Sequence, residues 1–187
     1  MAQSNAPFFE EAAHALRGCL ALVTGKRDAS AYFDFSQRGL VGSLIAAVVA
    51  VMLAAFGPQL LGIHMPAGAA TQSVIVNGVL FLAQAGMAAI VLRQMGRQDG
   101  FIPYLVASNW VTLFSAVLLL ISTLFGEAGI VLLLGIAIVA LLTFINIGRF
   151  IVTLTPLQIG LLFVSQAVGV FLALGIVALF LPASALT

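Results

Sequence analysis

The chain has 187 residues, of which 63% are hydrophobic and only 7% are charged, and its formal net charge is +1. Soluble globular domains carry about 25% charged and 45–50% apolar residues, so this composition excludes a soluble domain. The mean hydropathy is +1.22, and apolar runs of about 20 residues recur, the length that crosses roughly 30 Å of hydrocarbon. The sequence therefore predicts an all-α polytopic membrane protein. Its single cysteine, Cys19, excludes an intramolecular disulfide.

Residues 1–38 form the only polar segment of any size, and we expect them to lie on the cytoplasmic side. Within this segment, apolar residues recur at helical spacing and predict an amphipathic helix over about residues 8–24. The stripe consists of Phe9, Ala13, Leu16, Leu20 and Val23. Such a helix either lies on the membrane surface or packs under the bundle, and it is also the segment expected to meet a protein partner.

Five apolar segments follow, and each is long enough to span a bilayer. Thr71 is the expected N-cap of the second, and Thr155 followed by Pro156 opens the fifth. Pro103 stands in the first turn of the third, and Gly126 follows its end. The predicted spans are residues 40–61, 71–92, 102–125, 129–149 and 156–181.

The positions of the basic residues support an odd number of spans. All seven fall on one side of a five-span chain, whereas four or six spans would scatter them. They are Arg17, Lys26, Arg27, Arg38, Arg93, Arg97 and Arg149. Because basic loops favour the cytoplasm, we expect the N-terminus inside and the C-terminus on the opposite side. Arg93, Arg97 and Arg149 could contact anionic headgroups, although topology alone accounts for their positions.

A stripe of small residues runs along the first span, at Gly42, Ala46, Ala50 and Ala54. Small residues at four-residue spacing let membrane helices approach closely. We interpret the stripe as packing within the chain, with a homo-oligomer seam as the alternative.

The third span carries polar side chains along one helical face, which we expect to turn away from lipid. They are Tyr104, Ser108, Thr112, Ser115 and Ser122. At 1.5 Å per residue, one polar side chain from each of four spans falls roughly 10–15 Å from the cytoplasmic boundary. These are Gln84, Asn109, Thr143 and Gln166. Such a layer either joins helices by hydrogen bonds or lines a small cavity that opens toward the cytoplasm.

Several kinds of chemistry are missing from the expected spans. No Asp, Glu, Lys or Arg lies in the middle of a span, which disfavours a proton-coupled transporter. His14 and His64 lie on opposite sides of the membrane, so they cannot form one metal or acid–base site. No phosphate-binding glycine loop is visible. We therefore expect no enzymatic activity, no cofactor, no metal and no nucleic-acid partner.

Two segments, ALRGCLALVTGKRDASAYFDFSQRGLVGSL and FIPYLVASNW, resemble a group of small uncharacterised bacterial membrane proteins that is distantly similar to the Yip family. The eukaryotic Yip family combines an N-terminal cytoplasmic region and five spans with GTPase-linked vesicle traffic and membrane shaping. A bacterial chain lacks those GTPase partners, and its cytoplasmic region is only 38 residues here. The resemblance therefore implies a location in the bacterial inner membrane, the topology, and a non-enzymatic role associated with lipids or proteins.

Two hypotheses of function follow. The first is a non-enzymatic membrane protein that organises lipids or partner proteins, with the amphipathic helix as its surface element. The alternative is a channel or carrier for a small neutral solute that uses the polar layer.

Overall fold

The computed structural model describes residues 8–180, except for the side chain of Glu127. This part of the chain is helical, and it contains five helices long and apolar enough to cross a membrane. They are α2 (Gln37–Leu60), α3 (Ala69–Gln94), α4 (Phe101–Ser122), α5 (Gly129–Asn146) and α6 (Pro156–Phe180). A shorter helix, α1 (Phe8–Val23), precedes them. The structure thus confirms the all-α class and the five candidate spans.

The boundaries agree with the sequence to within about three residues, and the differences have local causes. Helix α3 begins two residues before Thr71, because Gly68 adopts a left-handed conformation (φ 84°) and takes the N-cap position. The expectation of a Thr71 cap is therefore wrong. Ser36 caps α2 by accepting a hydrogen bond from the amide of Gly39. The predicted end of the fifth span, at residue 181, lies outside the described residues.

Short helical turns connect the long helices. Helix α4 runs into η3 (Thr123–Ala128), which is kinked at Gly126, and α5 continues into the π-helical turn η4 (Ile147–Ile151). Two further turns, η1 (Ala29–Tyr32) and η2 (Gln98–Gly100), precede α2 and α4 respectively. We call the end of the bundle that holds η1, η2 and η4 the basic end, since Arg38, Arg93, Arg97 and Arg149 belong to it.

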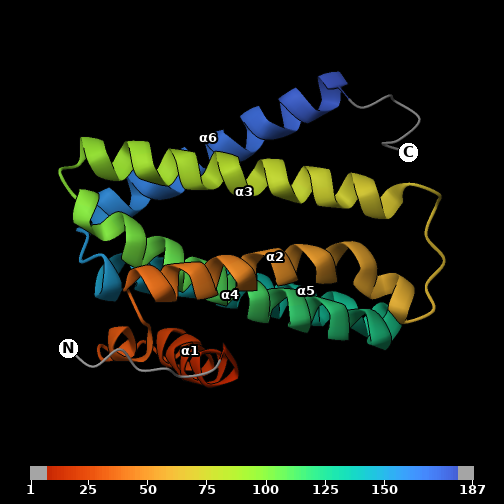
Figure 1. The fold of residues 1–187 in the computed structure, drawn as a ribbon, viewed down its shortest axis with the longest axis horizontal. Coiled ribbons are helices and arrows are strands. Elements are labelled where there is room, and N and C mark those ends of the chain that lie inside the picture. Colours follow the sequence, from red (N-terminus) through yellow and green to blue (C-terminus); the bar gives the residue numbers. More distant parts are fainter. Residues whose placement is uncertain (1–7, 181–187) are drawn as a thin grey trace.

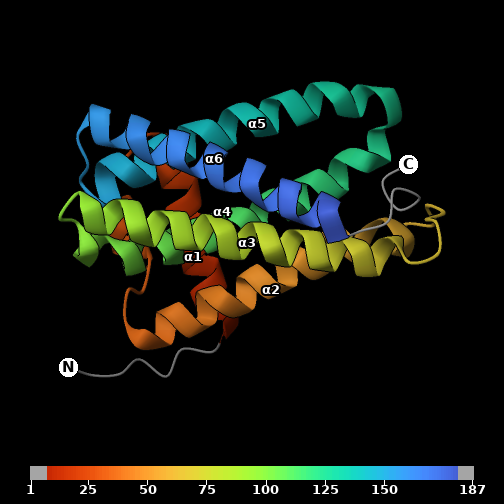
Figure 2. The same cartoon turned by 90° about the horizontal axis from the view of Figure 1, so that it is seen from above.

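The long helices run roughly along one axis, whereas α1 crosses that axis near the basic end (Figures 1 and 2). Helix α2 packs most extensively on α4, and α3 packs mainly on α6. Helix α1 contacts α4 and α5 rather than standing apart from the bundle. The molecule is therefore an α2–α4–α5 group, which supports α1, joined to an α3–α6 pair.

The small-residue stripe of the first span is used within the chain. Ala46 and Ala50 are 0% and 2% exposed, and Gly42 is also buried, whereas Ala54 is exposed. A dimer seam through Gly42, Ala46 and Ala50 is therefore wrong, because these residues are covered by the chain's own helices. Close packing of small residues is the main way in which membrane helices associate.

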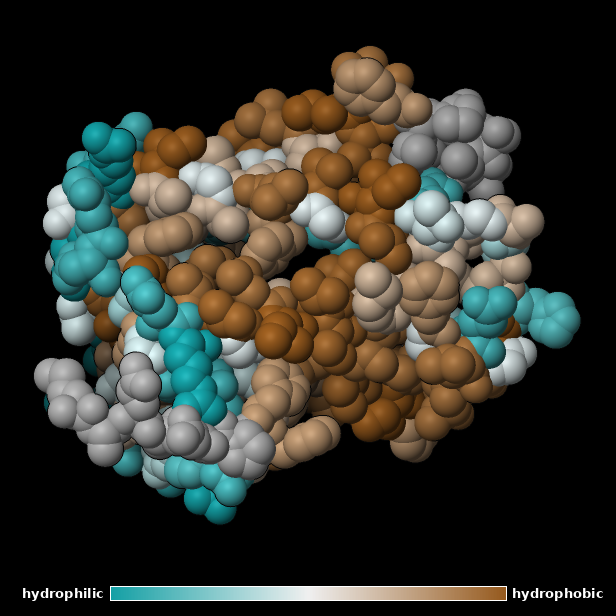
Figure 3. Space-filling model, viewed as in Figure 1, coloured by the Kyte–Doolittle hydropathy of each residue, from teal (hydrophilic) through white to brown (hydrophobic). Residues whose placement is uncertain are grey.

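The outer surface of the spans is apolar. Figure 3 shows a broad brown band across the long helices, with hydrophilic residues gathered over the basic end and over α1. In α3 only 6% of the most apolar window is buried, and in α5 only 11%. An apolar surface of this extent requires lipid around it.

Candidate functional site

Helix α1 is attached to the bundle through its inner face. Ala15, Cys19 and Leu22 are buried on that face. The ring of Phe8 lies 5.6 Å from that of Trp110 on α4. At the other end of α1, the Asn146 side-chain amide donates a 2.7 Å hydrogen bond to the Leu22 carbonyl oxygen. This bond satisfies one of the carbonyl groups that a helix end leaves unpaired.

The predicted apolar stripe of α1 lies on the opposite side of the helix from these contacts. Phe9 is 83% exposed, Leu16 43% and Leu20 58%. The small residues Ala15, Gly18 and Cys19 form the inner face because they allow close approach to the bundle. Helix α1 therefore has two apolar faces, one that contacts the protein and one that is open to the surroundings. The sequence allowed α1 either to lie on the membrane surface or to pack under the bundle. In the structure, α1 contacts the bundle through one face and keeps a second apolar face exposed.

Residues of α1, of η1 and of the segment that leads into α2 line a polar cavity of about 420 Å³. Charged and aromatic side chains line it, including Glu10, Glu11, His14, Asp34 and Arg38. It lies beside the first turn of α2, at the basic end of the bundle.

Glu11 is the unusual member of this cavity. Its carboxylate lies against Gly42, where a Cβ atom would overlap it, so the glycine makes room for the acid. One carboxylate oxygen is buried without a hydrogen-bond partner among the described residues. Burial raises the pKa of Glu11, the charge of Asp34 raises it further, and Arg38 opposes both. The site therefore stabilises the charged carboxylate less than water does.

The partner of Asn109 is Ser43 on α2. The Asn109 side chain is 3% exposed, and its amide donates a 3.2 Å hydrogen bond to the Ser43 hydroxyl. That hydroxyl in turn donates to the Leu40 carbonyl oxygen at 2.8 Å. This short chain joins the two helices that share the most extensive contact in the bundle.

The other members of the predicted layer make separate contacts. The Gln166 side-chain amide donates a 3.0 Å hydrogen bond to the backbone carbonyl oxygen of Gln84, and this bond joins α6 to α3. Thr143 is buried, and its hydroxyl donates to the Val139 and Ala140 carbonyl oxygens of its own helix. Within residues 8–180, no hydrogen bond links Asn109 or Thr143 to the Gln84–Gln166 contact. The predicted layer is therefore divided. Asn109 lies at the α2–α4 interface, Gln84 and Gln166 lie at the α3–α6 interface, and Thr143 lies on α5.

The polar stripe of the third span does not turn fully inward. Thr112 is exposed and Ser108 and Ser115 are half-buried, whereas Tyr104 and Ser122 are buried. The expectation of an inward stripe is wrong at Thr112, whose hydroxyl donates to the Ser108 carbonyl oxygen at 2.8 Å. Such back-bonding satisfies a hydroxyl within its own helix, so that it can face lipid.

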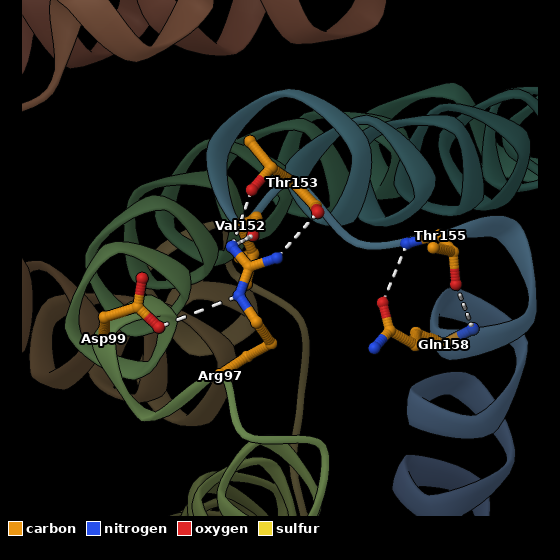
Figure 4. Close-up of polar contacts among 6 residues, drawn as sticks. All are labelled: Arg97, Asp99, Val152, Thr153, Thr155 and Gln158. Carbon is orange, nitrogen blue, oxygen red and sulfur yellow. Dashed lines mark hydrogen bonds and ion pairs between the residues drawn. The ribbon is translucent and has the colours of Figure 1, made fainter.

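A charged clamp joins the connections at the basic end (Figure 4). Arg97 donates to the Thr153 carbonyl oxygen at 2.8 Å, to the Thr153 hydroxyl at 2.6 Å, and to the Val152 carbonyl oxygen. Its Nε lies 3.7 Å from the carboxylate of Asp99. Thr153 has a φ of 56°, a strained conformation for a β-branched residue. The clamp ties the α3–α4 connection to the α5–α6 connection.

Beside the clamp, Thr155 precedes Pro156 at the start of α6, as the sequence predicts, and the structure adds Gln158 as its partner. The Gln158 side-chain oxygen accepts from the Thr155 amide at 2.9 Å, and the Thr155 hydroxyl accepts from the Gln158 amide at 3.4 Å. The pair forms a reciprocal capping box (Figure 4).

Sequence reasoning missed Ser43 and Asn146. Ser43 lies about 9 Å from the start of α2 and Asn109 about 12 Å from the start of α4, so the depth argument could have paired them. No sequence signal pairs Asn146 with Leu22, because that contact depends on how α1 folds back under α5.

The remaining predicted residues lie as follows. His14 lines the polar cavity, whereas His64 lies in the loop between α2 and α3 at the opposite end. No group of three or more His, Cys, Asp or Glu residues within 8–180 is arranged to hold a metal ion. The chain is a small integral membrane protein whose spans are in contact with lipid. Comparison with protein-family models, curated proteins and solved structures finds no match, so the Yip resemblance gains no support from them.

Proposed function

We propose that this protein is a non-enzymatic organiser of the membrane surface, with α1 as the element that contacts lipid. The observation that carries the proposal is the outward apolar face of α1, where Phe9, Leu16 and Leu20 are exposed on a helix that crosses the span direction. A helix in this position inserts its apolar face into the boundary between headgroups and acyl chains. We place that surface on the cytoplasmic side, since the basic residues gather there.

The docked inner face supports a lasting structural role for α1. Phe8, Leu22 and Asn146 hold α1 against α4 and α5. An interfacial helix fixed to five spans occupies area in one leaflet wherever the protein resides. Asymmetric insertion of this kind favours curvature.

The hydroxyl groups of the buried core support a non-enzymatic role. Ser43, Ser122 and Thr143 all donate to backbone carbonyl oxygens of their own helices. A nucleophile instead requires an adjacent base to accept its proton. The solute-channel alternative is weakened in the same way, because Asn109 and Gln166 bond at different helix interfaces.

The test compares two double variants reconstituted in vesicles. Leu16→Ala/Leu20→Ala removes apolar area from the outer face of α1. Leu118→Ala/Leu142→Ala makes the same chemical change at residues of similar exposure on α4 and α5. We expect the wild type and the span variant to shift vesicles toward smaller diameters at high protein content, and the α1 variant to lose this shift.

Electron cryomicroscopy of the vesicles gives the diameters. A chain lacking residues 1–30 that curves vesicles as strongly as the full chain would contradict the proposal. Equal binding of membrane proteins by the full and truncated chains in pull-down assays would remove the version in which α1 acts on partner proteins.

A further inference from the structure

An apolar groove of about 770 Å³ opens between α5 and α6 at the basic end. Its volume is in the range of about 300–1,000 Å³ that is typical of ligand sites. Leu141, Phe144 and Ile145 line it from α5, and Gly160 and Phe163 line it from α6. From Arg149 to Leu141 the groove extends roughly 12 Å toward the middle of the bilayer.

The polar rim of this groove is Arg149. Its guanidinium lies 5.2 Å from the ring centroid of the adjacent Phe150. Within residues 8–180 it has no hydrogen-bond or ion-pair partner, in contrast to Arg97, which is held by Thr153 and Asp99. Nearby, Thr155 and Gln158 satisfy each other. The rim therefore presents one unpaired positive charge above an apolar groove.

We propose that the groove between α5 and α6 binds one anionic phospholipid, with an acyl chain between the two helices and the phosphate on Arg149. Charge complementarity selects an anionic headgroup, since a guanidinium pairs closely with phosphate oxygens. The apolar lining selects an acyl chain, which the surrounding bilayer supplies. This proposal does not depend on the role of α1.

The shape of the groove allows a clean test. A Cβ atom at Gly160 would meet nothing within 4 Å, so the backbone there has room for a side chain, and leucine adds apolar volume to the lining of the groove. Gly175, on the same helix, is equally open but does not line the groove, and Gly175→Leu is its matched control. For the charge, Arg149→Gln is compared with Arg93→Gln, which removes another exposed arginine at the basic end.

The experiment measures lipid retained by the full chain, purified in detergent with added phosphatidylglycerol or phosphatidylcholine, by native mass spectrometry. We expect wild type, Arg93→Gln and Gly175→Leu to retain one phosphatidylglycerol in preference to phosphatidylcholine. Arg149→Gln should weaken that retention about fivefold, the scale expected for one basic side chain at an anionic headgroup. Gly160→Leu should weaken retention of both lipids.

Inorganic phosphate at the same concentration should not displace the lipid, because it lacks the acyl chain. The proposal is overturned if Arg149→Gln and Gly160→Leu retain phosphatidylglycerol as the wild type does. It is equally overturned if Arg93→Gln and Gly175→Leu lose as much lipid as the groove variants.

Discussion

Asn109 and Ser43 show how a single polar residue is held inside an apolar bundle. The amide bonds across to α2, and the serine hydroxyl bonds back to its own helix. Thr112 is exposed, and its hydroxyl donates to the Ser108 carbonyl oxygen of its own helix. At the scale of residues, Asn109 therefore contributes to packing between helices, whereas Thr112 does not, because its hydrogen bond stays within one helix.

Asn109→Leu should lower the stability of the bundle by about 0.6 kcal/mol, and by no more than about 1.7 kcal/mol, the range measured for hydrogen bonds between membrane helices. Ser43 keeps its bond to Leu40, so no donor is left unpaired. Thermal unfolding in detergent measures the change. Thr112→Val is the control and should leave stability nearly unchanged, and an equal loss in both variants would contradict this account.

Glu11 should make the attachment of α1 depend on pH. Its pKa is raised in the folded protein above the ordinary value of 4.5. The folded state then binds this proton more tightly than the unfolded state, so the contribution of Glu11 to stability is greatest below pH 4.5 and is lost as the pH rises through the folded pKa. Glu11→Gln should raise the unfolding temperature at pH 7 and flatten its dependence on pH.

The same pH series on Glu10→Gln is the control, because Glu10 is an exposed acid on the same helix. A Glu11→Gln variant that keeps the full pH dependence of the wild type would show that another group titrates.

At the scale of elements, α1 is the helix whose position combines two kinds of contact. Its inner face contacts the bundle through the Phe8 and Trp110 rings and through the hydrogen bond from Asn146 to the Leu22 carbonyl oxygen. Its outer face is apolar and exposed. Cys19 lies on the inner face, and burial raises the pKa of its thiol to about 12. A docked α1 therefore keeps this thiol protonated and covered at neutral pH.

Maleimide labelling of Cys19 should be slow in the wild type and faster in Asn146→Leu, because loss of the bond to Leu22 loosens the end of α1. Asn77→Leu is the matched control, since the Asn77 amide donates to Ser73 of its own helix. Labelling is followed by the mass of the intact chain. Rapid labelling of the wild type at pH 7 would contradict the buried position of Cys19.

At the scale of the whole molecule, the α3–α6 pair must be held to the α2–α4–α5 group. Arg97 contributes by joining the connection before α4 to the connection before α6, at the residue where Thr153 adopts its strained conformation. Strained backbone persists only where the surroundings determine it, and the three contacts of the guanidinium do so here.

Arg97→Gln should destabilise the protein by about 1.5–3 kcal/mol, the range for hydrogen bonds to a charged group. Arg93→Gln removes the same charge from the neighbouring exposed position and should cost little. Unfolding by denaturant in detergent compares the two. Equal stability of both variants would mean that the clamp contributes nothing measurable.

Much of the architecture follows from the sequence alone. The length and apolarity of the spans, the Thr155 cap and the extent of α1 depend on local properties, which the sequence contains directly. The small-residue stripe is also visible in the sequence, but the surface that covers it is not. Whether α2 packs this stripe against a second chain or against its own chain depends on how the helices are arranged.

The amino-acid sequence by itself determined that the chain has five segments long and apolar enough to cross a membrane and that α1 is apolar along one stripe. Hydrophobic periodicity and span length are properties of short segments. Only the tertiary structure decided that Asn109 bonds to Ser43, that the stripe of α1 faces outward, and that Arg149 lies at the rim of an apolar groove with no ion-pair partner among residues 8–180. These outcomes depend on the distances between residues far apart in the chain, and packing between helices sets those distances.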